Sequence, residues 1–294
     1  DSYYSLVRQD MTTELPAVGS GKLLSQNHLF PYIGPRDDVS YYLDASLVDF
    51  YFNSVHGVVP NSHRLPSVVE LYASMERDVL KSAQVVYSFS HSLACQLKNM
   101  YGLGDVQIQV VGAGPNLKSL PKPIVRSLRS PLRMLFIGLD FERKGGMFLL
   151  STVKQLSELD VVLDVVTSTQ FHSNVENVRF HPPCGPARRG RIYRDADMFV
   201  FPTLFEPFGL VLCEAMAYSL PVVATRTGAV SEIVGSHSDD LLLYPDGDIA
   251  SQISAKVKML NDNELRNHIG SMNLQYVSEK FTWSIACRHI FDRW

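Results

Sequence analysis

Short apolar runs alternate with helical segments along residues 132–280, and this alternation constrains the fold more than any other feature of the chain. Apolar runs separated by polar helices predict a parallel sheet with helices on both of its faces. We therefore expect an α/β fold in this half of the chain. The expected strands are 133–137, 161–166, 198–201, 221–224 and 241–243, and the expected helices are 146–158, 188–195, 209–218, one beginning near Ser231 and a long helical tail.

Three glycine-containing loops follow three of these predicted strands. Their sequences are FERKGG, PTLFEPFG and TRTGAV. Ligands of open parallel sheets bind outside the carboxyl ends of the strands. The three loops are therefore expected to converge on one edge of the sheet and to form a binding site there.

Two glutamates flank the start of the helix that follows the second loop. Glu206 lies in the loop, whereas Glu214 lies inside the helix, which Pro221 must end. A carboxylate in this position can accept hydrogen bonds from both hydroxyls of a ribose, and we expect this role of Glu214. Glu206 lies nearer the helix start, where it can contact a transferred sugar or stabilise positive charge at the anomeric carbon.

The start of the same helix is suited to anions. The first N–H groups of a helix have no partner within it and lie at the positive end of its dipole. Here they belong to Phe208, Gly209 and Leu210, which we expect to receive phosphate or sugar oxygens. Gly209 also lets the ligand approach the backbone closely.

The first loop supplies positive charge. The strand ends at Gly138, and the next helix begins near Gly145 or Gly146. Strand, glycine loop and helix in this order are typical of phosphate binding. We expect Lys144 to act as a mobile cation beside a diphosphate, with the amide of Gly145 close to it. Arg143 either adds to this charge or points into solvent.

The stretch EPFGLVLCEAMAYSLPVVAT, followed by TGAVSEIV, resembles the donor-site signature of the retaining glycosyltransferases of family 4. The resemblance implies the GT-B fold, in which two Rossmann-like domains face a cleft and the second binds a nucleoside-diphosphate sugar. It implies sugar transfer to a hydroxyl acceptor with retention at the anomeric carbon. Gly228, in the third loop, joins the expected donor-binding residues. We expect no metal and no cofactor, because Lys144 and nearby amides are expected to stabilise the leaving group.

The sequence departs from the family pattern at three places. Leu139 stands where the family usually has an arginine after the glycine, and Ala113 stands where it has an asparagine. Asp44 stands where many relatives have a histidine. Asp44 is therefore the candidate for a catalytic residue on the acceptor side.

Two domains and a linker are expected. Residues 1–117 are predicted to form the acceptor-side domain, with strands at 41–45, 85–89 and 107–111 and a helix at 67–82. Residues 118–131 are the linker, and residues 132–280 form the donor domain. The helix 281–294 is a candidate to pack back on the first domain. No opening strand with a glycine-rich turn is found, so we expect the front of the first domain to be missing.

Composition limits the partners. At 294 residues and a net charge of −3, the chain is expected to be soluble and not to bind nucleic acid. The expected partners are a nucleotide-sugar donor and a saccharide or lipid-linked acceptor. The basic segment 118–133 and the arginines of 188–194 are either solvated or touch anionic lipid or a phosphate-bearing acceptor. Four scattered cysteines indicate neither a zinc site nor a disulfide framework, so we expect a cytoplasmic protein. A peripheral position on the cytoplasmic face of the membrane is the alternative.

Two other functions are alternatives to that of a glycosyltransferase. A non-catalytic protein that binds nucleotide sugars would fit the missing front of the first domain and the leucine at 139. A dehydrogenase would need a GxGxxG turn after a strand and an acidic residue about twenty positions later, and the sequence has no such pattern. Hydrolysis of nucleotide sugars would separate the glycosyltransferase from the binding protein.

Overall fold

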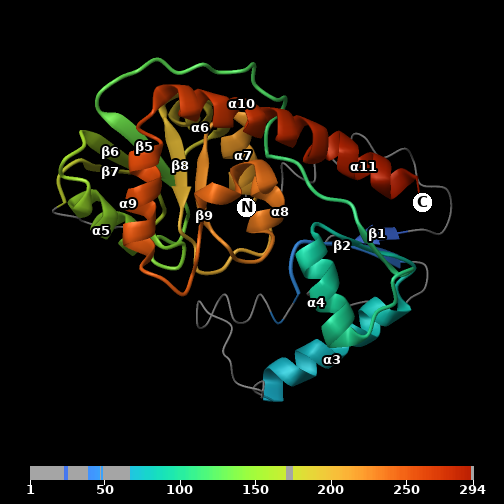
Figure 1. The fold of residues 1–294 in the computed structure, drawn as a ribbon. Helices are drawn as coiled ribbons and strands as arrows, with labels where there is room; N and C mark the ends of the chain where they lie inside the picture. The colour runs from blue at the N-terminus through green and yellow to red at the C-terminus, as the bar shows by residue number, and fades with distance from the viewer. Residues whose placement is uncertain (1–22, 26–38, 47, 49–66, 170–174, 293–294) are drawn as a thin grey trace. The chain divides into compact units, whose positions relative to one another are not determined.

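The chain folds into two compact units. The computed structural model describes residues 23–25, 39–46, 48, 67–169 and 175–292 (Figure 1). One unit comprises Asp1–Asn116 together with Trp283–Trp294, and the other comprises Leu117–Thr282.

The second unit is built on a sheet of six parallel strands in the order β10-β9-β8-β5-β6-β7. Its strands are apolar because both faces of the sheet are covered, and β8 and β9 are buried along their whole length. The strands are β5 (Leu132–Ile137), β6 (Val161–Val166), β7 (Val178–His181), β8 (Met198–Phe201), β9 (Val222–Thr225) and β10 (Leu242–Leu243).

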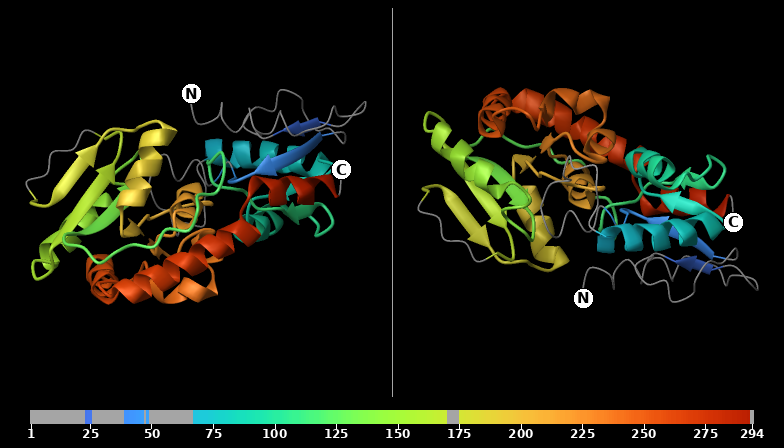
Figure 2. Two further views of the ribbon diagram at one scale, coloured as in Figure 1. Left: turned by 90° about the horizontal axis from the view of Figure 1, so that it is seen from above. Right: turned by 90° about the horizontal axis from the view of Figure 1, so that it is seen from below.

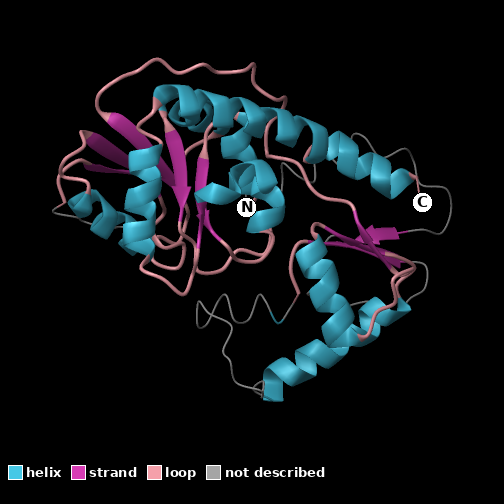
Figure 3. Cartoon of the chain, viewed as in Figure 1, coloured by secondary structure: helices cyan, strands magenta, loops and turns pink. Residues whose placement is uncertain are grey.

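Helices cover both faces of this sheet. Figure 2 shows α5 and α6 on opposite sides of the strands, and Figure 3 shows the same layers coloured by type of element. Asp248 and Asp262 start the two longest helices of the unit, since the carboxylate of each accepts backbone N–H bonds in the first turn. The helices are α5 (Gly146–Gln155), α6 (Pro186–Asp195), α7 (Leu210–Ala217), α8 (Val230–Val234), the 3₁₀ helix η1 (Ser236–Leu241), α9 (Ile249–Met259) and α10 (Asn263–Lys280).

The strand order reverses beside β5. The chain runs outward from β5 through β6 to β7, then crosses back by α6 to place β8 on the other side of β5. In open α/β sheets the crevice at such a reversal is where ligands bind. The loops that follow β5 and β8 both lie at this point of the sheet.

The first unit contains a smaller parallel sheet in the order β1-β2-β3-β4. Its strands are β1 (Leu23–Ser25), β2 (Val39–Leu43), β3 (Val86–Ser88) and β4 (Ile108–Val110), and its helices are α3 (Ser67–Ser82), α4 (His91–Tyr101) and α11 (Trp283–Phe291). The C-terminal helix α11 contacts this sheet, because the hydroxyl of Tyr87 donates to the carbonyl of Ile290 at 3.5 Å.

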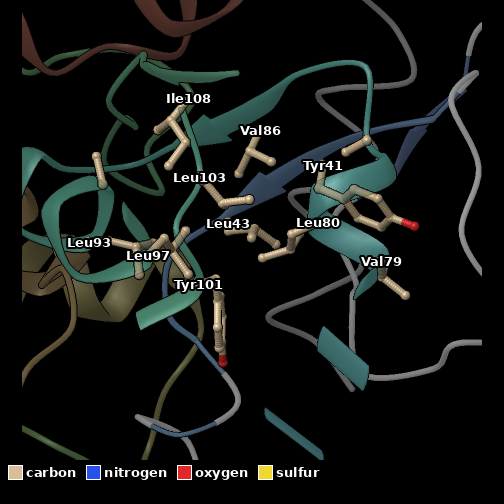
Figure 4. Close-up of a cluster of buried hydrophobic side chains, with 12 residues drawn as sticks. Tyr41, Leu43, Val79, Leu80, Val86, Leu93, Leu97, Tyr101, Leu103 and Ile108 are labelled. Carbon is tan, nitrogen blue, oxygen red and sulfur yellow. The ribbon is translucent and has the colours of Figure 1, made fainter. Parts of the chain in front are cut away.

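The core of the first unit joins β2, β3 and β4 to α3 and α4. Leu43, Leu80 and Leu97 are almost wholly enclosed, each exposing 1% or less of its surface (Figure 4). The cluster consists of Tyr41, Leu43, Val79, Leu80, Ala83, Val86, Leu93, Ala94, Leu97, Tyr101, Leu103 and Ile108.

Two short strands, β1 and β7, are not predicted by the sequence pattern. The strand β7 reads Val-Arg-Phe-His and lies at the edge of its sheet, paired with β6 alone. An edge strand needs no continuous apolar run, so polar residues hide it from a pattern based on burial.

The basic linker segment does not lie wholly in solvent, which corrects one of the two interpretations of its sequence. Arg126 exposes only 6% of its surface, and Asn267 holds its backbone through hydrogen bonds of 2.8 Å to both its N–H and its carbonyl. Burial lowers the pKa of Arg126 to about 10, so its guanidinium remains charged at neutral pH.

None of the helices in the described part of the chain has the length and apolar character that a membrane span requires.

Candidate active site

Three loops meet at the carboxyl ends of β5, β8 and β9, as the sequence predicts. Gly145 of the first loop has φ 81°, and a Cβ added there would lie 1.8 Å from the carbonyl oxygen of Pro202, which follows β8. Gly228 of the third loop has φ 49°, and a Cβ there would lie 1.9 Å from the carbonyl oxygen of Glu206. The backbones therefore approach so closely that only glycine fits at either position.

An ion pair joins the first two loops. The Nζ atom of Lys144 lies 2.7 Å from Oε2 of Glu206, and the two side chains expose only 13% and 12% of their surfaces. The same Nζ lies 3.5 Å from the carbonyl oxygen of Phe205 and 5.5 Å from the centre of the Phe201 ring. The structure thus brings together two residues that the sequence analysis assigned to separate roles.

The rest of the first loop is held by contacts to β6 and within the loop itself. Gly138 donates its N–H to the carbonyl of Val166 on β6 at 3.0 Å, which holds the loop to the sheet. The Nε of Arg143 lies 3.2 Å from the carboxylate of Asp140, three residues earlier. Leu139, which replaces the family's usual arginine, exposes 64% of its surface.

The helix α7 begins directly after Gly209 and carries Glu214 into the interior. Glu214 exposes 5% of its surface, and its Oε2 accepts a hydrogen bond of 3.0 Å from the hydroxyl of Tyr193. Nε of Arg189 lies 3.5 Å from the same oxygen. Tyr193 is not among the residues predicted from the sequence, because its hydrogen bond to Glu214 joins two different helices and no local spacing reveals it.

The remaining predicted residues lie at the start of α7 and in the first unit. Phe208 is buried and Leu210 is half-buried at the helix start. Asp44 follows β2 in the first unit and its side chain is exposed. Among the described residues, no three His, Cys, Asp or Glu side chains form a group that could hold a metal ion.

The geometry offers a cation, two carboxylates and a helix start at one edge of the sheet. Lys144 can bind an anion because an ammonium has three N–H donors, and the two contacts to Glu206 and Phe205 do not use all of them. The start of α7 adds backbone N–H groups and the positive end of its dipole. These features suit a ligand that combines phosphate with hydroxyl groups.

Residues 131–263 match the family described as "Glycosyl transferases group 1". This segment is a group 1 glycosyl transferase domain. The resemblance to the family 4 glycosyltransferases is therefore confirmed. The matched segment contains all three loops, the Lys144–Glu206 pair and the whole of α7.

Two curated relatives are also named as sugar transferases. A D-inositol 3-phosphate glycosyltransferase of Corynebacterium kroppenstedtii is 34% identical over 116 residues, which cover 39% of this chain and 25% of that protein. An MMP alpha-(1->4)-mannosyltransferase of Mycolicibacterium hassiacum is 24% identical over 231 residues, which cover 74% of this chain and 56% of that protein. The chain thus spans between a quarter and just over half of the length of these two relatives.

A solved structure confirms the fold class. WaaG, described as a glycosyltransferase involved in lipopolysaccharide biosynthesis, superimposes with a TM-score of 0.69 at 17% identity. The superposition covers 97% of this chain and 80% of that one. The glycosyl transferase domain described above therefore belongs to a GT-B fold.

Proposed function

We propose that this chain is a glycosyltransferase that moves a sugar from a nucleoside diphosphate to a hydroxyl group of a saccharide or lipid-linked acceptor. The observation that carries the proposal is the Lys144–Glu206 pair, which lies where the loops after β5 and β8 meet. A cation and a carboxylate 2.7 Å apart can serve the two halves of one donor: the diphosphate and the sugar. The family of the domain and the names of its relatives support the same reaction class.

In this proposal the bond between the anomeric carbon and the phosphate oxygen breaks, and the diphosphate leaves with the electron pair. Lys144 and the N–H groups at the start of α7 stabilise the negative charge that develops on the leaving group. Glu206 stabilises the positive charge at the anomeric carbon, and Glu214 binds the ribose. The acceptor oxygen then forms the new bond with retention of configuration and gives up its proton to a base, for which Asp44 is the acceptor-side candidate.

The cysteines and the exposed arginines of α6 support a location for the proposed reaction. None of the four cysteines, all of which lie in the described residues, forms a disulfide, and this fits a reducing cytoplasm. Arg188, Arg191 and Arg194 are exposed on α6 and could contact anionic headgroups. We therefore place the reaction in the cytoplasm, with peripheral contact to the membrane as part of the proposal.

Hydrolysis of the donor tests the reaction without knowledge of the acceptor. UDP-glucose, GDP-mannose and ADP-glucose are each incubated with the protein, and the released sugar is measured. We expect slow hydrolysis of one of them. Proton NMR identifies the anomer that forms first and so shows whether the configuration is retained. Binding of a nucleoside diphosphate without hydrolysis or transfer would favour the non-catalytic alternative. Absence of both binding and hydrolysis would contradict a nucleotide-sugar site.

Replacing Lys144 with alanine should weaken the binding of a nucleoside diphosphate by about ten- to a hundredfold, since a hydrogen bond to a charged group contributes about 1.5–3 kcal/mol. Binding of the corresponding nucleoside should change much less, because it lacks the diphosphate. Isothermal titration calorimetry measures both affinities. Lys154→Ala, which removes an exposed lysine from α5, is the matched control. Equal losses for nucleoside and diphosphate would argue against this role of Lys144.

Activity should persist in excess EDTA, because the proposed leaving-group stabilisation uses Lys144 and backbone N–H groups. Donor hydrolysis is measured before and after chelation, and again after adding back manganese or magnesium. Loss of activity that either metal restores would refute the metal-independent mechanism.

A further inference from the structure

Glu214 is held from one side by the helix α6. Both of its polar contacts described above reach the same oxygen, Oε2, and both come from side chains four residues apart on that helix: Arg189 and Tyr193. Residues four apart in a helix lie on the same face. One face of α6 is thus directed at one carboxylate of α7.

The two contacts are chemically different. Tyr193 is fully enclosed, and burial, followed by the nearby charge of Glu214, raises the pKa of its hydroxyl well above the ordinary value of 10.0. The hydroxyl therefore keeps its proton and remains a hydrogen-bond donor at physiological pH. Arg189 keeps 24% of its side chain exposed and supplies the opposite charge that a buried carboxylate requires.

Packing fixes the donor as well as the acceptor. The ring of Tyr193 stacks on that of Tyr218 with their centres 5.1 Å apart and an angle of 10° between them. The carbonyl of Tyr193 accepts a hydrogen bond of 3.3 Å from Arg126. The Tyr193 hydroxyl is therefore not free to follow Glu214 into another rotamer, so the direction of the carboxylate is determined from outside α7.

We infer that Tyr193 is a positioning residue that orients Glu214 toward the ribose and thereby makes the site select ribonucleotides over deoxyribonucleotides. This inference rests on the proposed function, because it requires a nucleotide at α7. Without the hydroxyl of Tyr193, the carboxylate would keep the charge of Arg189 beside it but would lose the donor that the enclosed Tyr193 ring holds in place. Selection between ribose and deoxyribose depends on the direction of the carboxylate, whereas binding of the diphosphate by Lys144 does not.

The test uses Tyr193→Phe, which removes one oxygen and keeps the buried ring. Titration calorimetry on the full chain compares UDP, GDP and ADP with their 2′-deoxy forms. We expect the wild type to bind its preferred ribonucleotide about tenfold more tightly than the deoxy form, as expected for a hydrogen bond to a charged group. In Tyr193→Phe this ratio should fall toward one, because the ribonucleotide loses more affinity than the deoxynucleotide, which offers Glu214 only its 3′-hydroxyl.

Tyr218→Phe is the matched control, because the Tyr218 ring stacks on Tyr193 while the Tyr218 hydroxyl points to a different place. This hydroxyl lies beside Gly190: a Cβ added to Gly190 would be 2.7 Å from its oxygen. We expect the wild-type ratio in this variant. Arg189→Gln provides a second variant that alters the same oxygen of Glu214 from the exposed side, and its ratio should also fall.

The outcomes separate this inference from the proposed function. If the wild type binds none of the three diphosphates, the proposed function is wrong and the inference is wrong with it. If the wild type selects ribose, and Tyr193→Phe and Arg189→Gln select it equally well, the site stands and the positioning role of Tyr193 is refuted. An equal loss of affinity for both forms of the nucleotide would also refute it, since a merely structural defect has that effect.

Discussion

Replacing Glu206 with glutamine should lower the turnover number by about a hundredfold or more, while the affinity for a nucleoside diphosphate stays the same or rises. The loss follows from the proposed position of the carboxylate beside the anomeric carbon, where removal of one well-placed electrostatic group costs about 10²–10³ in kcat. The unchanged or higher affinity for the nucleoside diphosphate has a separate cause. Lys144 is paired with Glu206 at 2.7 Å, so a neutral amide there releases the lysine to the diphosphate.

Glu214→Gln should behave in the opposite way and is the natural comparison. An amide at this position can no longer accept both ribose hydroxyls, so the affinity for the ribonucleotide should fall about tenfold. Turnover at saturating donor should fall less than in Glu206→Gln. Steady-state kinetics and calorimetry on both variants decide the matter, with circular dichroism to show that each is folded. If both bind and turn over like the wild type, no site exists at the start of α7.

The sequence predicts most of the second unit, because the signals there are local. The strands at 161–166 and 198–201 are found with the expected bounds, since strands buried on both faces read as continuous apolar runs. The helix α7 ends before Pro221, which cannot continue a helix. The convergence of the three loops also follows from sequence, because the carboxyl ends of parallel strands share one edge.

The partners of the site residues are not predictable in the same way. Lys144 and Glu206 are 62 positions apart, and the ion pair exists only because β5 and β8 are neighbours in the sheet. Tyr193 contributes to the surroundings of Glu214 through the packing of two helices, which no sequence spacing encodes. Composition alone also misjudges Arg126, since a basic segment usually lies in solvent. The roles assigned to the site residues themselves stay predictions.

Replacing Arg126 with methionine should destabilise the protein by about 3–5 kcal/mol, because each buried carbonyl that is left without its donor costs about 1–3 kcal/mol. The guanidinium donates hydrogen bonds to four backbone carbonyls that would otherwise lack these partners in the interior. These carbonyls belong to Tyr193, Ala196, Tyr218 and Ser219, at distances between 2.5 and 3.3 Å. They lie at the ends of α6 and α7, so the variant loosens the two helices that carry Tyr193 and Glu214.

Urea unfolding followed by circular dichroism measures the loss, with Arg226→Met as the control. Arg226 forms an ion pair with Asp239 at 2.5 Å, but the two side chains keep 27% and 53% of their surfaces exposed. Pairs of this kind contribute about 1 kcal/mol or less, so the control should unfold close to the wild type. A loss in Arg126→Met no larger than in Arg226→Met would show that the four carbonyls find other partners. In that case the linker is not what holds the ends of α6 and α7 in place.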